Sequence, residues 1–245
     1  MQPHLKIDKV EKYVILPGDP GRINKILTYL GNPEEVQFNR EYRTSKAEHL
    51  GIKISCVSSG IGCPSAAIAV EELAKIGAKV IIRLGTCGGL LKEMQPGDLM
   101  IPEAAFCGDG TSKEYGKESQ IIKANEKVFS ALKKAAESLK VRHHTGVNRT
   151  HDAFYEPIEN FIALEGKNLA SSEMECSSVY LVSKIRNLMA GAVLVINTPE
   201  PPELVKENPS IIYQLIDKEK VNQGMENAIK VILEAIKILE QDEQS

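Results

Sequence analysis

No apolar stretch of the 245-residue chain approaches the roughly 20 residues that a membrane-spanning helix needs. The first residues, MQPHLKIDKVEKY, are too polar for the apolar segment of a secretory signal. These two absences predict a cytoplasmic protein that has no membrane partner.

Cysteines are few, scattered and without a C-x-x-C pair. Their odd number and spacing argue against both a disulfide framework and a zinc site. We therefore expect no bound metal, and we expect most of the five to be small buried hydrophobic residues: Cys56, Cys63, Cys87, Cys107 and Cys176.

An excess of charge of one sign is also lacking, since 30 basic and 33 acidic residues leave a net charge of −3. Such a chain has no overall field that would gather nucleic acid, although a local cationic pocket is compatible with it. No linker rich in proline, serine or glycine divides the sequence, and its hydrophobic content is 42%. These features predict one domain that spans residues 1–245.

Short β-branched runs alternate with segments of helical period along the chain. This alternation predicts an α/β fold whose central sheet is mixed, largely parallel and flanked by helices. The predicted strands are residues 13–18, 51–60, 78–85, 97–106, 141–150 and 191–198. The predicted helices are residues 20–30, 64–76, 125–139 and 175–185, with a long helix near the C-terminus.

The stretch LPGDPGRINKI joins a strand to a helix, with Asp19 as the expected N-cap and Pro20 at the first helical position. Free backbone N–H groups, the flexible Gly18 and the side chain of Arg22 suit a phosphate or another oxyanion. The P-loop pattern is absent. An ordinary capped turn with a surface arginine is the alternative interpretation.

The stretch IIRLGTCGGL places Arg83 inside an otherwise apolar strand, where a guanidinium is costly unless it meets a carboxylate or an anion. Thr86 follows at the carboxyl end of the strand, which is where α/β sheets bind ligands. Either an internal salt bridge or a bound anion accounts for this arginine.

The segment SSGIGCPSAA places Gly60 and Gly62 before a helix that starts at Pro64. It lacks the third glycine and the correctly placed acidic residue of a dinucleotide-binding fingerprint. We therefore expect no dinucleotide cofactor.

The segment SSEMEC carries two carboxylates on one face of a short strand, at Glu173 and Glu175, with Met174 between them. Carboxylates accept hydrogen bonds from hydroxyl groups, and methionine offers an adaptable apolar wall, so a sugar diol is a suitable ligand. Glutamates placed to favour a helix N-terminus are the alternative. The nearby pair Phe154 and Tyr155 either stacks on a heterocycle or packs in the core.

Six motifs in order make the chain resemble the nucleoside phosphorylase family, which includes hexameric purine nucleoside phosphorylases and uridine phosphorylases. They run from His4 to about Ile238 and are PGDPGR, NREY, GIGCPSAAIAVEEL, IIRLGTCGG, DAFY and SEMEC. The resemblance implies a pentosyltransferase that cleaves a ribonucleoside with inorganic phosphate as co-substrate and needs no further cofactor. It also implies a hexamer built as a trimer of dimers.

The resemblance assigns roles to three groups of residues. It implies a phosphate site formed by Gly18, Arg22, Arg40, Arg83 and Thr86, with Arg40 reaching the phosphate of a neighbouring subunit. It implies a ribose site formed by Glu173, Met174, Glu175 and a neighbour's His4. It implies a base site formed by Cys87, Gly88, Phe154, Asn197 and Glu200.

Two departures from the family pattern affect the base site. Purine members carry Ser-Asp after the last strand, where this chain has NTPEPPE, so Glu200 or Asn197 takes the place of the acid. Uridine members carry Gln-x-Arg after the Phe-Tyr pair, where this chain has Ile158 and Asn160. The predicted catalytic residues are Glu200, Arg22 and Arg83, with purine nucleosides favoured and uridine as the alternative.

Two further functions remain open from the sequence. A nucleosidase on the same fold uses water, but its members lack the phosphate-binding arginines that this chain has. A non-catalytic nucleoside-binding protein is the other alternative, because the usual leaving-group acid is missing.

Overall fold

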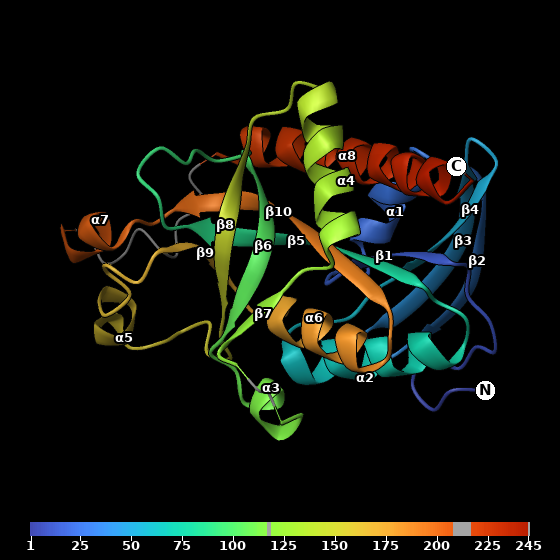
Figure 1. Cartoon of the computed structure of the whole chain (residues 1–245), viewed down its shortest axis with the longest axis horizontal. Coiled ribbons are helices and arrows are strands. Elements are labelled where there is room, and N and C mark those ends of the chain that lie inside the picture. Colours follow the sequence, from blue (N-terminus) through green and yellow to red (C-terminus); the bar gives the residue numbers. More distant parts are fainter. Residues whose placement is uncertain (117–118, 208–216, 245) are drawn as a thin grey trace.

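The computed structural model describes residues 1–116, 119–207 and 217–244 (Figure 1). Its strands are β1 (Tyr13–Pro17), β2 (Gly31–Asn39), β3 (Tyr42–His49), β4 (Ile52–Val57), β5 (Val80–Gly89), β6 (Leu99–Cys107), β7 (Ile121–Lys123), β8 (His143–Thr150), β9 (Leu169–Glu173) and β10 (Met189–Pro199). Its helices are α1 (Arg22–Leu27), α2 (Cys63–Lys75), α3 (Gly110–Glu114), α4 (Glu126–Ser138), α5 (Ile158–Ile162), α6 (Cys176–Ile185), α7 (Pro202–Glu207) and α8 (Lys218–Gln244).

The described strands form one mixed sheet. Strands β4, β1, β5 and β10 pair in parallel in this order, and β6, β8 and β9 form a second parallel group. Because β5 pairs with both β9 and β10, the strands β10, β6, β8, β9 and β5 close into a ring. The carboxyl ends of β1, β5 and β10 therefore meet at one edge, beside the end of β9.

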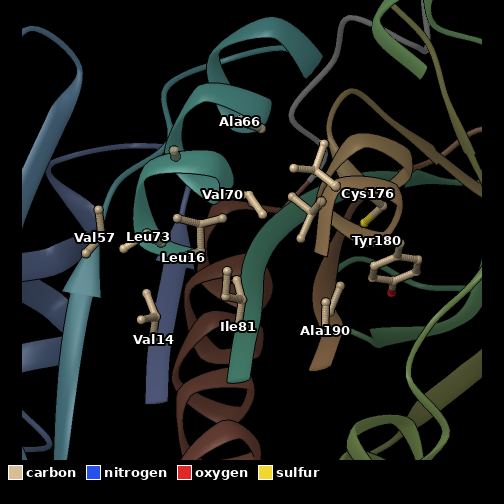
Figure 2. Close-up of a cluster of buried hydrophobic side chains, with 14 of the residues drawn as sticks. Val14, Leu16, Val57, Ala66, Val70, Leu73, Ile81, Cys176, Tyr180 and Ala190 are labelled. Carbon is tan, nitrogen blue, oxygen red and sulfur yellow. The ribbon is translucent and has the colours of Figure 1, made fainter. Parts of the chain in front are cut away.

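The central strands are buried on both faces, and alternate side chains pack against different helices. Val14 and Leu16 face a cluster that includes α2 and α6, whereas Tyr13 and Ile15 face one that includes α4 and α8. Figure 2 shows the first cluster, in which Val70 lies near the strand side chains. Each buried aliphatic side chain stabilises the fold by about 1.5–3 kcal/mol.

The helices cover the sheet in two layers, with α4 and α8 on one side and α2 and α6 on the other (Figure 1). Helix α8 is amphipathic, with Ile229, Ile232 and Ile236 buried against the sheet. No helix in the described ranges is long and apolar enough to cross a membrane. The predicted fold class, an α/β fold with a mixed sheet flanked by helices, is confirmed.

The start of α1 differs in detail from the sequence prediction. The helix begins at Arg22 with Gly21 as its N-cap, two residues after the expected cap at Asp19. The Asp19 carboxylate instead accepts a hydrogen bond from Gly21 N at 2.8 Å. Asp19 therefore closes the turn before the helix, and the phosphate-binding candidates Gly18 and Arg22 keep their places around this turn.

Candidate active site

A cavity of about 710 Å³ opens where the carboxyl ends of β1, β5, β9 and β10 meet. In open α/β sheets this edge is the usual ligand site, because the loops that follow the strands converge there. Most of the site residues predicted from the sequence line this cavity. The candidates that line it are Gly18, Arg22, Arg83, Thr86, Cys87, Gly88, Phe154, Glu173, Met174, Glu175, Asn197 and Glu200.

Two arginines lie at one end of this cavity. Arg22 Nη1 donates to the carbonyl oxygen of Leu84 at 3.1 Å, which holds the side chain against β5. Burial and the positive charge of Arg83 lower the pKa of Arg22. Thr86 and Gly18 line the same region. Two neighbouring guanidinium groups repel each other, so an anion bound beside them is stabilised.

Arg83 is held between two glutamates and is only 3% exposed. Its Nη2 atom lies 2.8 Å from Glu173 Oε2, its Nε donates to the same oxygen at 3.0 Å, and Nη2 also donates to Glu175 Oε2. The internal salt bridge that the sequence left open is therefore present. Arg83 nevertheless lines the cavity, so the two interpretations are compatible.

Glu173 acts as the anchor of this network. Its carboxylate also accepts from Asn148 Nδ2 and Thr150 Oγ1, each at 2.7 Å, and from the backbone N–H of Glu175 at 2.9 Å. The positive charge of Arg83 and these donors lower the pKa of Glu173 despite its burial. Because its oxygens already have partners, Glu173 orients Arg83 and the start of α6.

Glu175 lies beside this anchor and has acceptor capacity left. Its Oε1 accepts from Gly62 N at 2.5 Å, and its Oε2 accepts from Arg83. A carboxylate has about four lone-pair sites, so this side chain can still accept hydrogen bonds from a ligand in the cavity. Met174 lines the same part of the cavity. The backbone of Met174 is fixed because its carbonyl oxygen accepts from Cys63 Sγ at 3.2 Å.

Glu200 lies at the other end of the cavity, after β10. Its backbone N–H donates to Gly89 O at 2.7 Å, and the residue is 8% exposed. Burial, followed by the negative charge of Glu156, raises the pKa of Glu200 to about 8. The side chain is therefore largely protonated at neutral pH and offers both a donor and an acceptor. Cys87, Gly88, Phe154 and Asn197 line the cavity around it.

The family model of the phosphorylase superfamily matches residues 12–237. The chain belongs to the phosphorylase superfamily. A uridine phosphorylase of Thermococcus kodakarensis is 36% identical, with 100% of this chain and 89% of the relative covered. A guanosine phosphorylase of Halorubrum lacusprofundi is 34% identical, with 97% of this chain and 99% of the relative covered.

Solved structures of this superfamily have the same fold. A purine nucleoside phosphorylase from Toxoplasma gondii in complex with immucillin-H superposes with a TM-score of 0.88 at 31% identity, and 99% of this chain and 97% of that chain are covered. A uridine phosphorylase from Vibrio fischeri gives a TM-score of 0.86 at 31% identity, with 97% of each chain covered. The family assignment made from the sequence motifs is confirmed.

Two predicted site residues of this phosphorylase superfamily member lie apart from its own cavity lining. His4 Nδ1 lies 2.7 Å from Glu72 Oε1, and both His4 N and Leu5 N donate to the same carboxylate. Arg40 is exposed in the turn between β2 and β3 and has a φ of 55°. Both residues were predicted to act in a neighbouring subunit, and this role stays a prediction.

Several cavity-lining residues were not identified from the sequence. They include Glu41, Ser65, His151 and Glu156. Arg149, at the end of β8, pairs with Glu156 at the edge of the cavity. A signal for Arg149 is present in the sequence, because Arg149, like Arg83, is an arginine within a strand.

One group of possible metal ligands occurs in the part of the chain that the structure describes, formed by Cys63, Asp109 and Asp152. The Asp109 carboxylate already accepts from Ser112 N and Ser177 Oγ, each at 2.6 Å. Burial raises the pKa of the Cys63 thiol, which disfavours the thiolate that binds metals. The local hydrogen bonds explain this cluster without a metal.

Proposed function

We propose that this protein catalyses the reversible phosphorolysis of a ribonucleoside, preferably a purine nucleoside, to a free base and ribose 1-phosphate. One observation carries the proposal: a single cavity joins the two arginines, the Glu175 carboxylate and the protonated Glu200. The two arginines match the phosphate, Glu175 matches the ribose, and Glu200 matches the base. The related nucleoside phosphorylases support the reaction class.

Phosphate would bind beside Arg22, Arg83 and Thr86, with Gly18 allowing its close approach. Its negative charge stabilises the oxocarbenium character that develops at the glycosidic carbon, and its oxygen is placed to attack that carbon. Arginines suit this role because they do not titrate near neutral pH. In this arrangement Arg83 also links the phosphate to Glu175, whose free lone pairs would accept from the vicinal ribose hydroxyls beside Met174.

The leaving base needs a proton or a hydrogen bond as the glycosidic bond breaks. Glu200 can supply either one, since its raised pKa keeps the carboxyl group protonated near neutral pH. Asn197 lines the cavity nearby and offers hydrogen bonding without a titrating proton. Phe154 would lie along the base, with Cys87 and Gly88 between the sugar and the base.

Purine preference rests on the donors at the base end. Purine N7 is an acceptor that a protonated carboxyl can serve directly. At the positions where uridine members carry Gln-x-Arg, this chain has Ile158 and the exposed Asn160 on α5. Relatives with both kinds of name occur at similar identity, so uridine phosphorolysis is the alternative.

We also propose that His4 and Arg40 complete the ribose and phosphate sites of a neighbouring subunit in a dimer, three of which form a hexamer. The exposed position of Arg40 supports this proposal, because its neighbour Glu41 lines the cavity of its own chain. A cytoplasmic location and a role in nucleoside salvage complete the proposal.

The test is a panel of inosine, guanosine, adenosine, methylthioadenosine and uridine, each assayed with and without phosphate. We expect phosphate-dependent cleavage of purine nucleosides and formation of ribose 1-phosphate. Undiminished cleavage without phosphate would support a nucleosidase instead. Binding without cleavage of any member of the panel would support a non-catalytic nucleoside-binding protein.

The role of the base end is tested with Glu200→Gln and Asn197→Ala. We expect Glu200→Gln to lower kcat for inosine by about 10²–10⁴-fold, because the proton donor is lost while the shape of the side chain remains. Asn197→Ala should have the smaller effect. If neither variant slows turnover, the assignment of the base site is wrong.

A further inference from the structure

Two oppositely charged side chains without an assigned role lie beside the base end of the cavity. Arg149 donates from Nη1 and Nη2 to the two carboxylate oxygens of Glu156, at 2.6 and 2.7 Å. The side chains of this pair are only 11% and 7% exposed. A two-point contact of this kind fixes the guanidinium in one orientation. Arg149 Nη1 also lies 3.5 Å from Ser172 Oγ, which strengthens the restraint.

The Glu200 carboxyl group differs from the Arg149–Glu156 pair in its hydrogen bonding. No group within the described ranges donates a hydrogen bond to it, although its backbone is held by Gly89. Glu156 and Arg149 both act on it through space: the charge of Glu156 raises the pKa of Glu200, and the charge of Arg149 lowers it. The effect of Glu156 is the larger one. Glu156 therefore favours the protonated form of Glu200 directly.

Glu156 also fixes the direction in which the guanidinium group of Arg149 points. An arginine released beside a buried carboxyl group would form an ion pair with it, because a bidentate arginine–carboxylate contact is strongly favoured at a desolvated site. Glu200 would then be ionised and unable to donate a proton. With Arg149 engaged at both Nη atoms, this competing contact is blocked.

On the basis of the proposed function, we infer that Glu156 is a positioning residue that holds Arg149 away from Glu200 and so leaves the Glu200 carboxyl free to donate to the leaving base. The Arg149–Glu156 pair then serves the chemistry without touching the reacting atoms. It acts as a neutral unit that excludes one specific ion pair. The sequence around the pair, RTHDAFYE, separates the two charges by a loop that also carries Phe154.

Other titratable groups lie on the elements around Glu200. His151 lines the cavity, and its buried Nδ1 makes no hydrogen bond within the described part of the chain but lies 3.8 Å from Glu156 Oε1. Burial and the charge of Arg149 lower the pKa of His151, which favours the neutral ring. The remaining groups are Cys87 and Arg83 on β5, Glu173 on β9, Glu159 on α5, Lys92 after β5, and Glu203 and Lys206 on α7.

The deciding experiment compares pH profiles of kcat/KM for inosine phosphorolysis in wild type, Glu156→Gln and the double variant Arg149→Met/Glu156→Gln. In the wild type we expect the alkaline limb near pH 8, where Glu200 loses its proton. In Glu156→Gln the limb should move down by about one pH unit, because a positive charge is freed and a negative one is lost. That shift lowers the rate at pH 8 by about fivefold.

The double variant separates this role from a structural one. Removing Arg149 as well takes away the competing partner, so the limb should return close to its wild-type position. If the Arg149–Glu156 pair had only a structural role, removing Arg149 as well would not return the limb to its wild-type position. An N7-methylated purine nucleoside is a second probe, because its leaving base already carries the positive charge, and its cleavage should change little in either variant.

The exposed pair Arg186–Glu71 provides the matched control. Arg186 Nε and Nη2 contact both oxygens of Glu71 at 2.8 and 2.9 Å, and neither residue is among those that line the cavity. Glu71→Gln breaks a contact of the same geometry, and the pH profile should stay that of the wild type. The phosphate KM should remain unchanged in every variant.

The outcomes distinguish this inference from the proposed function. If inosine cleavage requires phosphate but the limb of Glu156→Gln coincides with that of the wild type, the inference is wrong and the function stands. Phosphate-independent cleavage overturns the function, while the limb can still be measured. Should Glu156→Gln fail to fold, Arg149→Met serves instead: a limb that rises supports the inference, because the charge of Glu156 then acts on Glu200 alone, and a limb that stays or falls overturns it.

Discussion

The Glu200 carboxyl group occupies the space that a side chain on Gly88 would need. A β-carbon built on Gly88 would lie 1.5 Å from Glu200 Oε1 and 2.3 Å from its carboxyl carbon. Any side chain at this position therefore requires the carboxyl group of Glu200 to move. Gly88 on β5 and Glu200 after β10 come together because these two strands pair in parallel.

Gly88→Ala should displace the carboxyl group of Glu200 from the base site. Since Glu200 is proposed to donate the proton, we expect kcat for inosine to fall by at least tenfold, while binding of phosphate at the far end of the cavity is retained. Steady-state kinetics with both substrates would measure this. Gly110→Ala is the control, because its β-carbon would lie 3.6 Å from the nearest atom, at an ordinary contact distance. Unchanged kcat in Gly88→Ala would contradict the proposed role of Glu200.

Arg83→Met should destabilise the fold strongly. The change leaves two buried carboxylates, Glu173 and Glu175, without their positive partner, and breaking a buried ion pair from one side costs about 3–5 kcal/mol. Urea unfolding at neutral pH would measure the loss as a lower midpoint. Arg186→Met removes an arginine from an exposed pair and should have little effect. An equal, small effect of both changes would show that Arg83 is not essential to the network.

The sequence predicted those parts of the fold that have a continuous apolar run or a helical period. The run YVILPG has a buried residue at every position of β1, and a strand was expected there. Strand β2, with the sequence GNPEEVQFN, is exposed over its first five residues and contains Pro33, so no apolar alternation indicates it. Its pairing with β3 is fixed by tertiary contacts, which a local pattern does not contain.

In the active site, too, local sequence patterns indicated some features, whereas others depend on tertiary contacts. Glycines and charges just after β1 and β5 indicated the cavity edge, because parallel strands end together there. The partners of these charges were harder to predict. Arg83 was known to need a carboxylate or an anion, but only the fold shows that both Glu173 and Glu175 reach it. The contact between Arg149 and Glu156 depends on the path of a loop, which has no sequence period.

Glu200 should make the wild-type protein less stable as the pH rises. Its pKa is about 8 in the folded state against a usual value of 4.5, so the folded state binds more protons than the unfolded state between these values. The free energy of unfolding therefore falls as the pH rises from about 4.5 to about 8, at up to about 1.4 kcal/mol per pH unit for this group. The penalty is fully present above pH 8.

Glu200→Gln removes this penalty, because an amide does not ionise. We expect the variant to be more stable than the wild type at pH 8.5 and nearly equal to it at pH 5, while its activity is low. Urea unfolding of both proteins at the two pH values would test the sign. A variant that is less stable at pH 8.5 than at pH 5, by the same amount as the wild type, would show that Glu200 is not the group responsible.

Mixing two inactive variants should restore activity if Arg40 completes a neighbour's site. Arg40→Ala removes a phosphate ligand from the partner's site, whereas Glu200→Gln disables the chain's own site. In a mixed dimer with reciprocal sites, one of the two sites receives both intact residues, so the purified mixed dimer should regain about half of the wild-type activity. Co-expression of differently tagged chains, followed by assay of the purified mixed dimers, would measure this. Activity in the mixture no greater than the sum of the two variants alone would place Arg40 outside the neighbour's phosphate site.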